Sequence, residues 1–289
     1  MVDLFRPQAA VAALRLLERR GLRVRFPWGQ TCCGQFAFNA GHDREAAELG
    51  RRLVEAFEEP GDGVPVVALS GSCAAMVRAE LPGLLEREAR ERGAGEAEAR
   101  AWRERAERLA ARVVELSHFL AGPEAAQARE GEPAPGGPAG AGLRVAYHNG
   151  CHMRRLLGVE EAPLRLLRQE GFEPLEPPAA DQCCGFGGLF SLVEPSLSAA
   201  MADAKLASLE EAREAGAVAL VSADLGCLLH LGGRLRRRGD AFPVVHLAEA
   251  AELAESGRLS EAALARASAL AAREAPGRPA AERAGGGEG

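Results

Sequence analysis

Seven cysteines form two similar groups along this 289-residue sequence. Two adjacent pairs, Cys32–Cys33 and Cys183–Cys184, each precede a glycine, and Cys73, Cys151 and Cys227 stand alone in other glycine-containing segments. Cysteine thiolates bind soft metal ions and iron–sulfur clusters, and they also act as redox catalysts. The residue types and their spacing therefore predict metal or redox chemistry.

The thiols do not fit a disulfide framework. Their number is odd, and the chain is long enough to bury a core without disulfides. The opening residues, MVDLFRPQAA, lack the basic start and apolar run of a signal peptide, and no run of about 18 apolar residues occurs. We expect a cytoplasmic protein without a transmembrane segment, whose reduced thiols can bind metal.

Several other functions are excluded or disfavoured. The net charge is −6, and the arginines are interleaved with glutamates, so the chain has no basic patch for nucleic acid. No G-x-G-x-x-G segment follows a predicted strand, and no Walker lysine is present. No Ser-His-Asp order or carboxylate pair offers a complete active site, so we expect no catalytic residue in this chain.

An internal repeat organises the elements that must position the cysteines. LRLLERRG at 14–21 resembles LRLLRQEG at 164–171, and the second cysteine pair follows the first by 151 residues. VVALSGSC, ending at Cys73, resembles ALVSADLGC, ending at Cys227. VVELSHFLA at 113–121 resembles VVHLAEAAE at 244–252. Four matches in the same order indicate a duplication.

The repeat predicts two domains, at residues 1–121 and 143–272. Between them, residues 122–142 are rich in Pro, Gly and Ala and have no hydrophobic period, which is typical of a flexible linker. We expect a disordered tail at 273–289. The Arg/Glu/Ala-rich segment 84–112 has no counterpart in the second copy and predicts a helical insertion.

Strands and helices are predicted to alternate. LRVAYH at 143–148 and AVALVSAD at 217–224 have the apolar character of buried strands, and 151–170 has a helical pattern. In the first copy, GLRVRF at 21–26 and VPVVALS at 64–70 take the strand positions. This order predicts an α/β fold of two duplicated half-domains, each a small doubly wound parallel sheet flanked by helices.

This fold predicts where the second-copy thiols lie. Cys151 and Cys227 each come just after a predicted strand, and parallel strands place their carboxyl ends at one edge of the sheet, where open α/β folds bind ligands. The loop with Cys183 and Cys184 can close over that edge because its glycines permit positive φ. We therefore expect four thiols to converge.

Four converging thiolates suit either a tetrahedral zinc ion or an iron–sulfur cluster. The sequence has no short C-x-x-C knuckle, and adjacent cysteines bind different irons of a cluster more easily than they bind one ion. This favours iron–sulfur over a zinc-bound structural module. Each cysteine could also be a small buried side chain, although the matched positions of Cys73 and Cys227 after strands argue against that for both.

Four segments together resemble a known family: FPWGQTCCGQFAFNAGH at 26–42, YHNGCHMRRLLGV at 147–159, DQCCGFGGLFS at 181–191 and SADLGCLLHLGGRL at 222–235. They resemble the cysteine-rich CCG domain family, whose domain is duplicated in one of the subunits of heterodisulfide reductase and in the iron–sulfur subunit of glycolate oxidase. The likeness is greatest to its lactate-utilisation protein A (LutA) branch. It covers nearly all of the chain except the linker, the insertion and the tail.

The resemblance implies an iron–sulfur electron-transfer subunit of a complex that oxidises L-lactate to pyruvate. The expected partners are another iron–sulfur subunit and a third lactate-utilisation protein, with heterodisulfide reductase-type and glycolate oxidase-type subunits as alternatives. A 4Fe–4S cluster is expected in each complete CCG domain. The implied ligands are Cys151, Cys183, Cys184, Cys227, Cys32, Cys33 and Cys73.

The sequence departs from the family pattern in two places. Fuller motifs end in C-x-x-C, but the first of those positions is Ser70 in one copy and Asp224 in the other, where Asp224 is either an oxygen ligand or a turn residue. The repeat also places the counterpart of Cys151 at residue 1 or just before it, where no cysteine stands. We expect the native start to lie upstream of Met1.

Three histidines lie beside the predicted ligands. His148 and His152 flank Cys151, and His230 follows Cys227 by three residues. A ligating or catalytic role is one interpretation. We favour the other, in which they cap helices or donate hydrogen bonds to a cluster sulfur.

Overall fold

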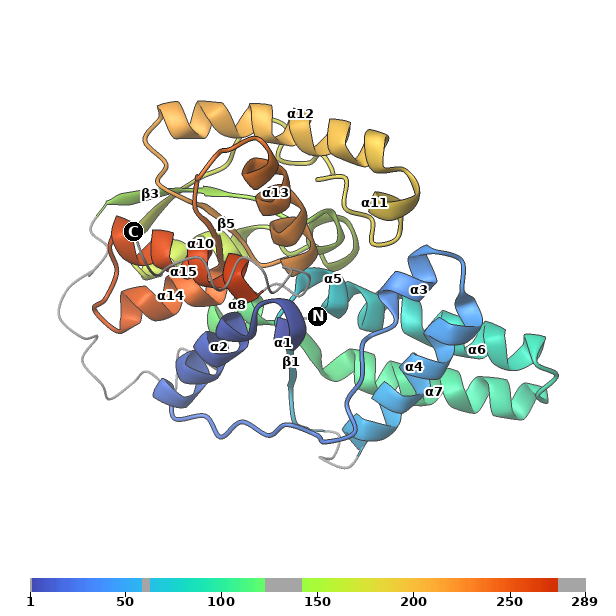
Figure 1. Ribbon diagram of the computed structural model, residues 1–289. Helices are drawn as coiled ribbons and strands as arrows, with labels where there is room; N and C mark the ends of the chain where they lie inside the picture. Colours follow the sequence, from blue (N-terminus) through green and yellow to red (C-terminus); the bar gives the residue numbers. More distant parts are fainter. Residues whose placement is uncertain (1, 59–62, 123–141, 275–289) are drawn as a thin grey trace, which may run out of the picture.

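The computed structural model describes residues 2–58, 63–122 and 142–274. Almost all of the predicted linker at 122–142 and of the predicted tail at 273–289 lies outside these ranges. Figure 1 shows the second copy of the repeat as a layered α/β unit, with the first copy beside it.

The second copy contains a four-stranded parallel sheet in the order β4-β3-β5-β6. Its strands are β3 (Leu143–Tyr147), β4 (Phe172–Leu175), β5 (Leu220–Ser222) and β6 (Val244–His246). Every residue of β5 and β6 is buried, because helices cover both faces of the sheet. These helices are α10 (Glu161–Gln169), α12 (Pro195–Glu214), α13 (Leu225–Arg237), α14 (Leu247–Glu255) and α15 (Glu261–Glu274). The predicted α/β class is confirmed.

The predicted helical region at 151–170 is not one helix. A π-helical turn, η2 (Met153–Leu157), ends at Gly158, where φ is +64°, and α10 begins at Glu161. The left-handed conformation at Gly158 breaks the hydrogen-bond ladder between the two segments.

The first copy has a smaller sheet than predicted. Only β1 (Val66–Ala68) and β2 (Val113–Glu115) pair, in parallel. The predicted strand at 21–26 is wrong, because this segment is extended but unpaired, with 42% of Val24 and 61% of Phe26 exposed. A strand here needs a neighbour equivalent to β3, and the described residues of the first copy contain none.

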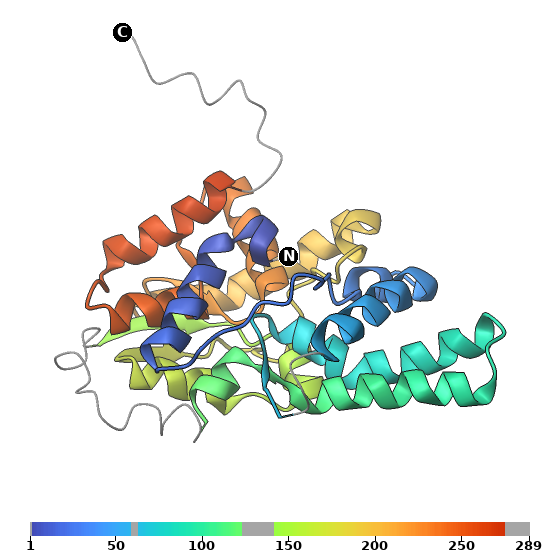
Figure 2. The same cartoon turned by 90° about the horizontal axis from the view of Figure 1, so that it is seen from below.

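The remaining helices lie mostly in the first copy. They are α1 (Val2–Phe5), α2 (Pro7–Arg19), α3 (Gln35–Asn39), α4 (Asp43–Glu58), α5 (Gly71–Ala75), the π-helical η1 (Met76–Glu80), α6 (Leu81–Glu91), α7 (Glu96–Arg112), α8 (Leu116–Leu120) and, in the second copy, α11 (Phe190–Val193). Figure 2 shows α6 and α7 side by side, projecting from the body of the molecule. Within the described ranges, none of the helices combines the length and the apolar character needed to cross a membrane.

Helices of each copy pack against the other copy. Helices α2 and α10, which carry the LRLL repeat, pack against α14 and α8 respectively, so that each packs against a helix of the other copy. Arg20 and Glu170, at equivalent repeat positions, form a buried ion pair of 3.5 Å. One apolar core contains Leu16 of α2, Leu116 of α8 and Tyr147 of β3. The domain boundaries drawn from the repeat stay a prediction, and this core is continuous across them.

The ends of β1 and β5 meet where the two copies touch. The Gly71 N–H donates to the Ala223 carbonyl (3.2 Å), and the Leu225 N–H donates to Ser70 Oγ (3.3 Å). In return, Asp224 Oδ2 accepts from the Ser72 N–H at 2.7 Å. This junction brings the first turns of α5 and α13, and with them Cys73 and Cys227, towards the boundary between the copies.

Candidate metal centre

The structure brings the four second-copy cysteines to one cavity of about 70 Å³. Cys151 follows β3, and Cys227 lies in the first turn of α13, just after β5. Cys183 and Cys184 come from the loop between β4 and α11. The convergence predicted at the carboxyl edge of the sheet is present.

The thiols are close enough to interact with one another. Cys184 Sγ lies 3.1 Å from Cys227 Sγ, and the Cys183 thiol interacts with those of Cys151 and Cys184. Hydrogen bonds from Cys151, Cys184 and the Gly185 N–H hold the pKa of Cys183 far below its usual value. The same contact with Cys183, together with burial, raises the pKa values of Cys151 and Cys184. Without metal, one thiolate is thus stabilised by neighbouring thiols, and a bound cation would replace their protons.

Glycines shape the loop that carries Cys183 and Cys184. Gly185 has a φ of +86°, and a Cβ there would lie 2.6 Å from the Ser198 carbonyl oxygen. No other residue fits this close approach to α12 without displacing backbone. Ser198 Oγ also donates to the Gly185 carbonyl at 2.7 Å, so the loop is held against α12.

The first copy supplies part of the cavity wall. Gln35 and Asn39 at the two ends of α3, and Ser72 of α5, line the cavity beside the cysteines. Phe36 follows Cys32 by four residues, and Phe186 follows Cys183 by three. Their rings meet edge to face, with centroids 5.6 Å apart. These first-copy residues were not predicted, because the repeat places the second-copy thiols at the edge of the second copy's own sheet. The similar positions of the two phenylalanines after the cysteine pairs were the one available signal.

The three first-copy cysteines form a second group. Cys33 is buried and its thiol interacts with those of Cys32 and Cys73, which are exposed and half-buried respectively. The contact with Cys32 lowers the pKa of Cys33, but the contact with Cys73 and burial outweigh it, so that the pKa is raised to about 12. Within the described residues no fourth thiol joins this group. The expected upstream start stays a prediction.

Asp224 acts as a helix cap. Its side chain is the N-cap of α13, where Oδ1 accepts from the Cys227 N–H at 3.3 Å while Oδ2 accepts from Ser72 of the other copy. Both carboxylate oxygens therefore already have backbone donors. This geometry favours the turn interpretation over oxygen ligation.

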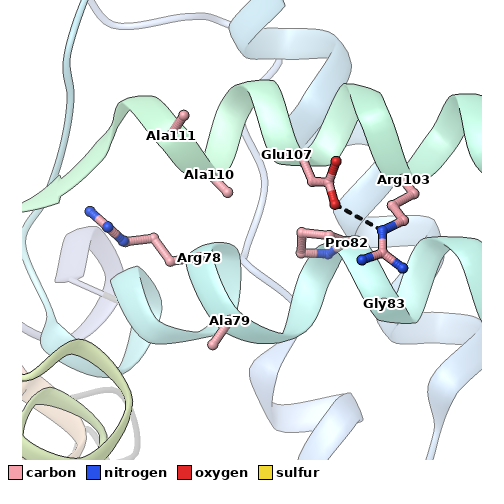
Figure 3. A pocket seen from close by; sticks show the side chains of 8 residues that line it. All are labelled: Arg78, Ala79, Pro82, Gly83, Arg103, Glu107, Ala110 and Ala111. Atoms are coloured by element: carbon pink, nitrogen blue, oxygen red, sulfur yellow. Dashed lines mark hydrogen bonds and ion pairs between the residues drawn. The ribbon is translucent and has the colours of Figure 1, made fainter.

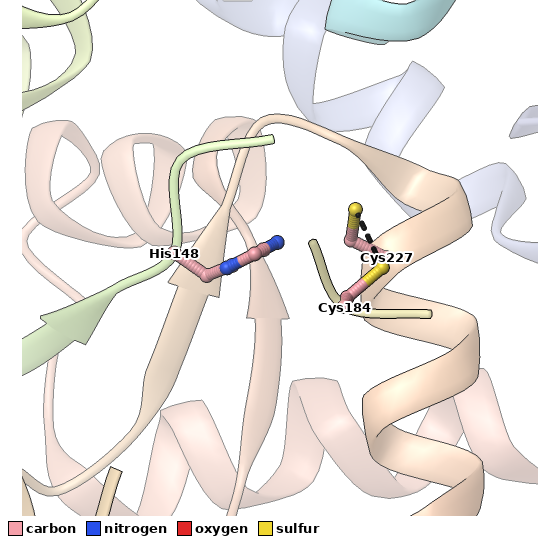
Figure 4. Close-up of side chains that lie close together, drawn as sticks. All are labelled: His148, Cys184 and Cys227. Atoms are coloured by element: carbon pink, nitrogen blue, oxygen red, sulfur yellow. Dashed lines mark hydrogen bonds between the residues drawn. The ribbon is translucent and has the colours of Figure 1, made fainter. Parts of the chain in front are cut away.

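The histidines near the centre differ in their partners. His152 Nδ1 lies 3.7 Å from Cys151 Sγ, and His230 Nε2 lies 3.1 Å from Ser198 Oγ. His148, in contrast, lies next to the thiols, with one ring nitrogen and the Sγ atoms of Cys184 and Cys227 all within 4.8 Å of one another (Figure 4). These three residues could hold a metal ion.

A wider hollow of about 500 Å³ lies elsewhere, between η1, α6 and α7 (Figure 3). Arg78, Pro82 and Ala110 line it, and Arg103 and Glu107 form an ion pair of 2.8 Å along α7 on one side of it. It contains none of the predicted site residues.

Comparison with known proteins assigns the family. A family model described as "CCG: Cysteine-rich domain" matches residues 1–78 and 145–232, which are more than half of the chain and include all seven cysteines. The chain belongs to the cysteine-rich CCG domain family. The two matched segments correspond to the two copies of the repeat, so the resemblance identified from the sequence is confirmed.

Two relatives of this CCG protein extend the likeness beyond the domain. The chain is 42% identical over 252 residues to Lactate utilization protein A of Geobacillus kaustophilus strain HTA426, a match that covers 86% of this chain and 94% of the relative. It is 37% identical to Lactate utilization protein A of Bacillus subtilis strain 168 over 252 residues, with the same coverage of 86% and 94%.

Proposed function

We propose that this chain is the iron–sulfur electron-transfer subunit of a cytoplasmic complex that oxidises L-lactate to pyruvate. The observation that carries the proposal is the convergence of four thiols on one cavity between the two copies. The names of the relatives supply the metabolic setting, the utilisation of lactate.

The donor set fits an iron–sulfur cluster. Cys151, Cys183, Cys184 and Cys227 offer four sulfur ligands, and Cys184 and Cys227 are buried where a cluster would be shielded from water. The first-copy group of Cys32, Cys33 and Cys73 is the candidate for a second cluster. A bound cluster of the expected 4Fe–4S type would supply reversible one-electron transfer.

The residues around the cavity have defined tasks in this proposal. The Gly185 N–H donates to Cys183 Sγ at 3.4 Å, which stabilises negative charge on that sulfur, and Cys227 lies in the first turn of α13, near the positive end of the helix dipole. Phe36 and Phe186 restrict the access of water from the side where the copies meet. Both effects would adjust the reduction potential of the bound group.

Lactate oxidation itself is assigned to partners. The cavity of about 70 Å³ is lined by the four thiols, which the proposal assigns to the cluster. The proposed partners are another iron–sulfur subunit and a third lactate-utilisation protein. This chain would receive electrons from their substrate site and pass them to an acceptor.

Metal analysis is the first experiment. Protein purified without oxygen is assayed for iron, zinc and acid-labile sulfide, and its absorbance is recorded before and after dithionite. We expect iron and sulfide in comparable amounts and a brown absorbance that dithionite bleaches. Zinc without sulfide in a colourless protein would overturn the proposal in favour of a structural zinc module.

A second experiment tests the metabolic assignment. The loaded chain is mixed anaerobically with an extract of source cells grown on L-lactate, and L-lactate, glycolate or a disulfide substrate is added in parallel. If L-lactate bleaches the absorbance of the cluster faster than glycolate or the disulfide does, the proposal is supported. Bleaching by glycolate alone, or turnover of the disulfide by the chain without extract, would instead support the glycolate oxidase-type or the heterodisulfide reductase-type function.

A further inference from the structure

His148 is a buried histidine without a hydrogen-bond partner. It follows β3 directly, only 2% of the residue is exposed, and neither Nδ1 nor Nε2 has a partner within the described part of the chain. Burying a polar group without a partner is costly, and such groups in folded proteins usually mark a missing ligand, ion or water. The ring therefore requires a partner that the polypeptide does not supply.

The ring points at the thiols. Figure 4 shows the His148 imidazole extending from the end of β3 towards Cys184 and Cys227, and one ring nitrogen and both Sγ atoms lie within 4.8 Å of one another. Atoms that bind one tetrahedral metal ion at about 2.0–2.3 Å lie within this range of one another.

Other histidines of the chain are satisfied by protein groups. His246 Nδ1 accepts from the Ala248 N–H at 3.1 Å, and its Nε2 lies 2.9 Å from the Leu69 carbonyl. His230 pairs with Ser198, and His152 contacts Cys151. His148 thus differs from three histidines that lie near the junction or the cysteines.

The backbone holds the ring in place. The His148 N–H donates to the Val221 carbonyl at 2.9 Å, which ties the backbone at the end of β3 to β5, and the residue is buried there.

We propose that His148 binds the second-copy metal centre directly through an imidazole nitrogen, beside Cys184 and Cys227. The centre then has mixed sulfur and nitrogen ligation. This inference rests on the proposed function for the identity of the metal as cluster iron. A neutral nitrogen ligand adds no negative charge, so the cluster has a higher reduction potential than one that binds a thiolate at that position.

The test is a magnetic measurement on the bound nitrogen. Protein labelled with ¹⁵N-histidine is reduced anaerobically, and pulsed electron–nuclear spectroscopy records the coupling of nitrogen to the cluster. We expect the strong coupling of a directly bound nitrogen, its loss in His148→Ala, and its retention in the matched variant His152→Ala. Should His148→Ala not fold, His148→Cys supplies a thiolate instead. This variant should retain iron, lose the coupling and have a lower midpoint potential.

Each result separates the inference from the proposed function. Iron and sulfide at full amount without a strong ¹⁵N coupling, or with a coupling that survives replacement of His148, overturns the inference alone. Zinc without sulfide overturns the proposed function, and X-ray absorption of the zinc then decides the inference. A nitrogen ligand at about 2.0 Å that disappears in the His148 variants supports it, and an all-sulfur shell refutes it.

Discussion

Replacement of Asp224 by alanine should destabilise the metal-free protein by about 3–6 kcal/mol, the sum for two hydrogen bonds to a buried charged group. The carboxylate belongs to a residue that is 3% exposed, and it accepts from the Ser72 N–H at 2.7 Å and from the Cys227 N–H at 3.3 Å. Alanine would leave both donors buried and unpaired. Because one donor begins α5 and the other α13, the loss affects both copies at their junction.

The assay is urea unfolding of the metal-free protein, followed by circular dichroism. Ser70→Ala is the matched control, since Ser70 is the repeat counterpart of Asp224 and its hydroxyl accepts from only one backbone group, the Leu225 N–H at 3.3 Å. We expect this variant to lose about 1 kcal/mol. Asp224→Asn keeps one acceptor oxygen and should fall between the two.

Two results would refute this reasoning. If Asp224→Ala unfolds within about 1 kcal/mol of the original protein, the carboxylate does not stabilise the junction as its hydrogen bonds indicate. If Asp224→Asn leaves the stability of the metal-free protein unchanged but abolishes metal binding, the carboxylate is a ligand and the capping interpretation is wrong.

Three further predictions address the junction and the centre. Burial raises the pKa of Glu115 from 4.5 to about 7 near the charge of Asp224 and the hydroxyl of Tyr147. Native Glu115 therefore binds its proton more tightly than the unfolded chain does, and stability should fall by about 3 kcal/mol as the pH rises between these pKa values. Urea unfolding at about pH 5 and about pH 8 should show no such fall in the free energy of unfolding of Glu115→Gln. An equal fall in both proteins would contradict the assignment. Lys205 is buried, donates to the Ala179 carbonyl at 2.8 Å and interacts electrostatically with Cys184 and Cys227, so Lys205→Met should lower the midpoint potential of the bound centre in a redox titration. An unchanged potential at full metal content would show that this charge does not act on the centre. Cys184→Ser should remove the second-copy metal while the far-ultraviolet circular dichroism is retained, whereas Cys32→Ser in the exposed first-copy position should leave that metal in place.

The α/β class was predictable because buried parallel strands have a distinctive composition. LRVAYH and AVALVSAD contain the apolar, partly β-branched residues of strands covered on both faces, and both segments contain strands, β3 and β5. GLRVRF has a similar composition, yet it is unpaired. Strand propensity describes how a residue fits a sheet, but whether a sheet neighbour exists depends on the rest of the chain.

The role of Asp224 as a helix cap shows a second limit of prediction from the sequence. Its position before the helix at 225–237 is that of an N-cap, which local sequence can indicate. Its bond to Ser72 joins residues 152 positions apart and could not be read from either copy alone. Local caps follow from neighbouring residues, whereas bonds across the junction follow from how the copies pack.

The duplication, the two groups of cysteines and the positions of Cys73, Cys151 and Cys227 after strands could be predicted, because they depend on residue order and on local chain geometry. The packing of the two copies decided that α2 and α10 contact helices of the opposite copy, and that Gln35, Asn39 and Ser72 of the first copy line the cavity of the second. The tertiary structure also decided that, within the described residues, both ring nitrogens of His148 are left without a partner beside Cys184 and Cys227. The physical reason is that apolar faces and polar groups are satisfied by whatever lies nearest in space, and that neighbour is set by the packing of the whole chain.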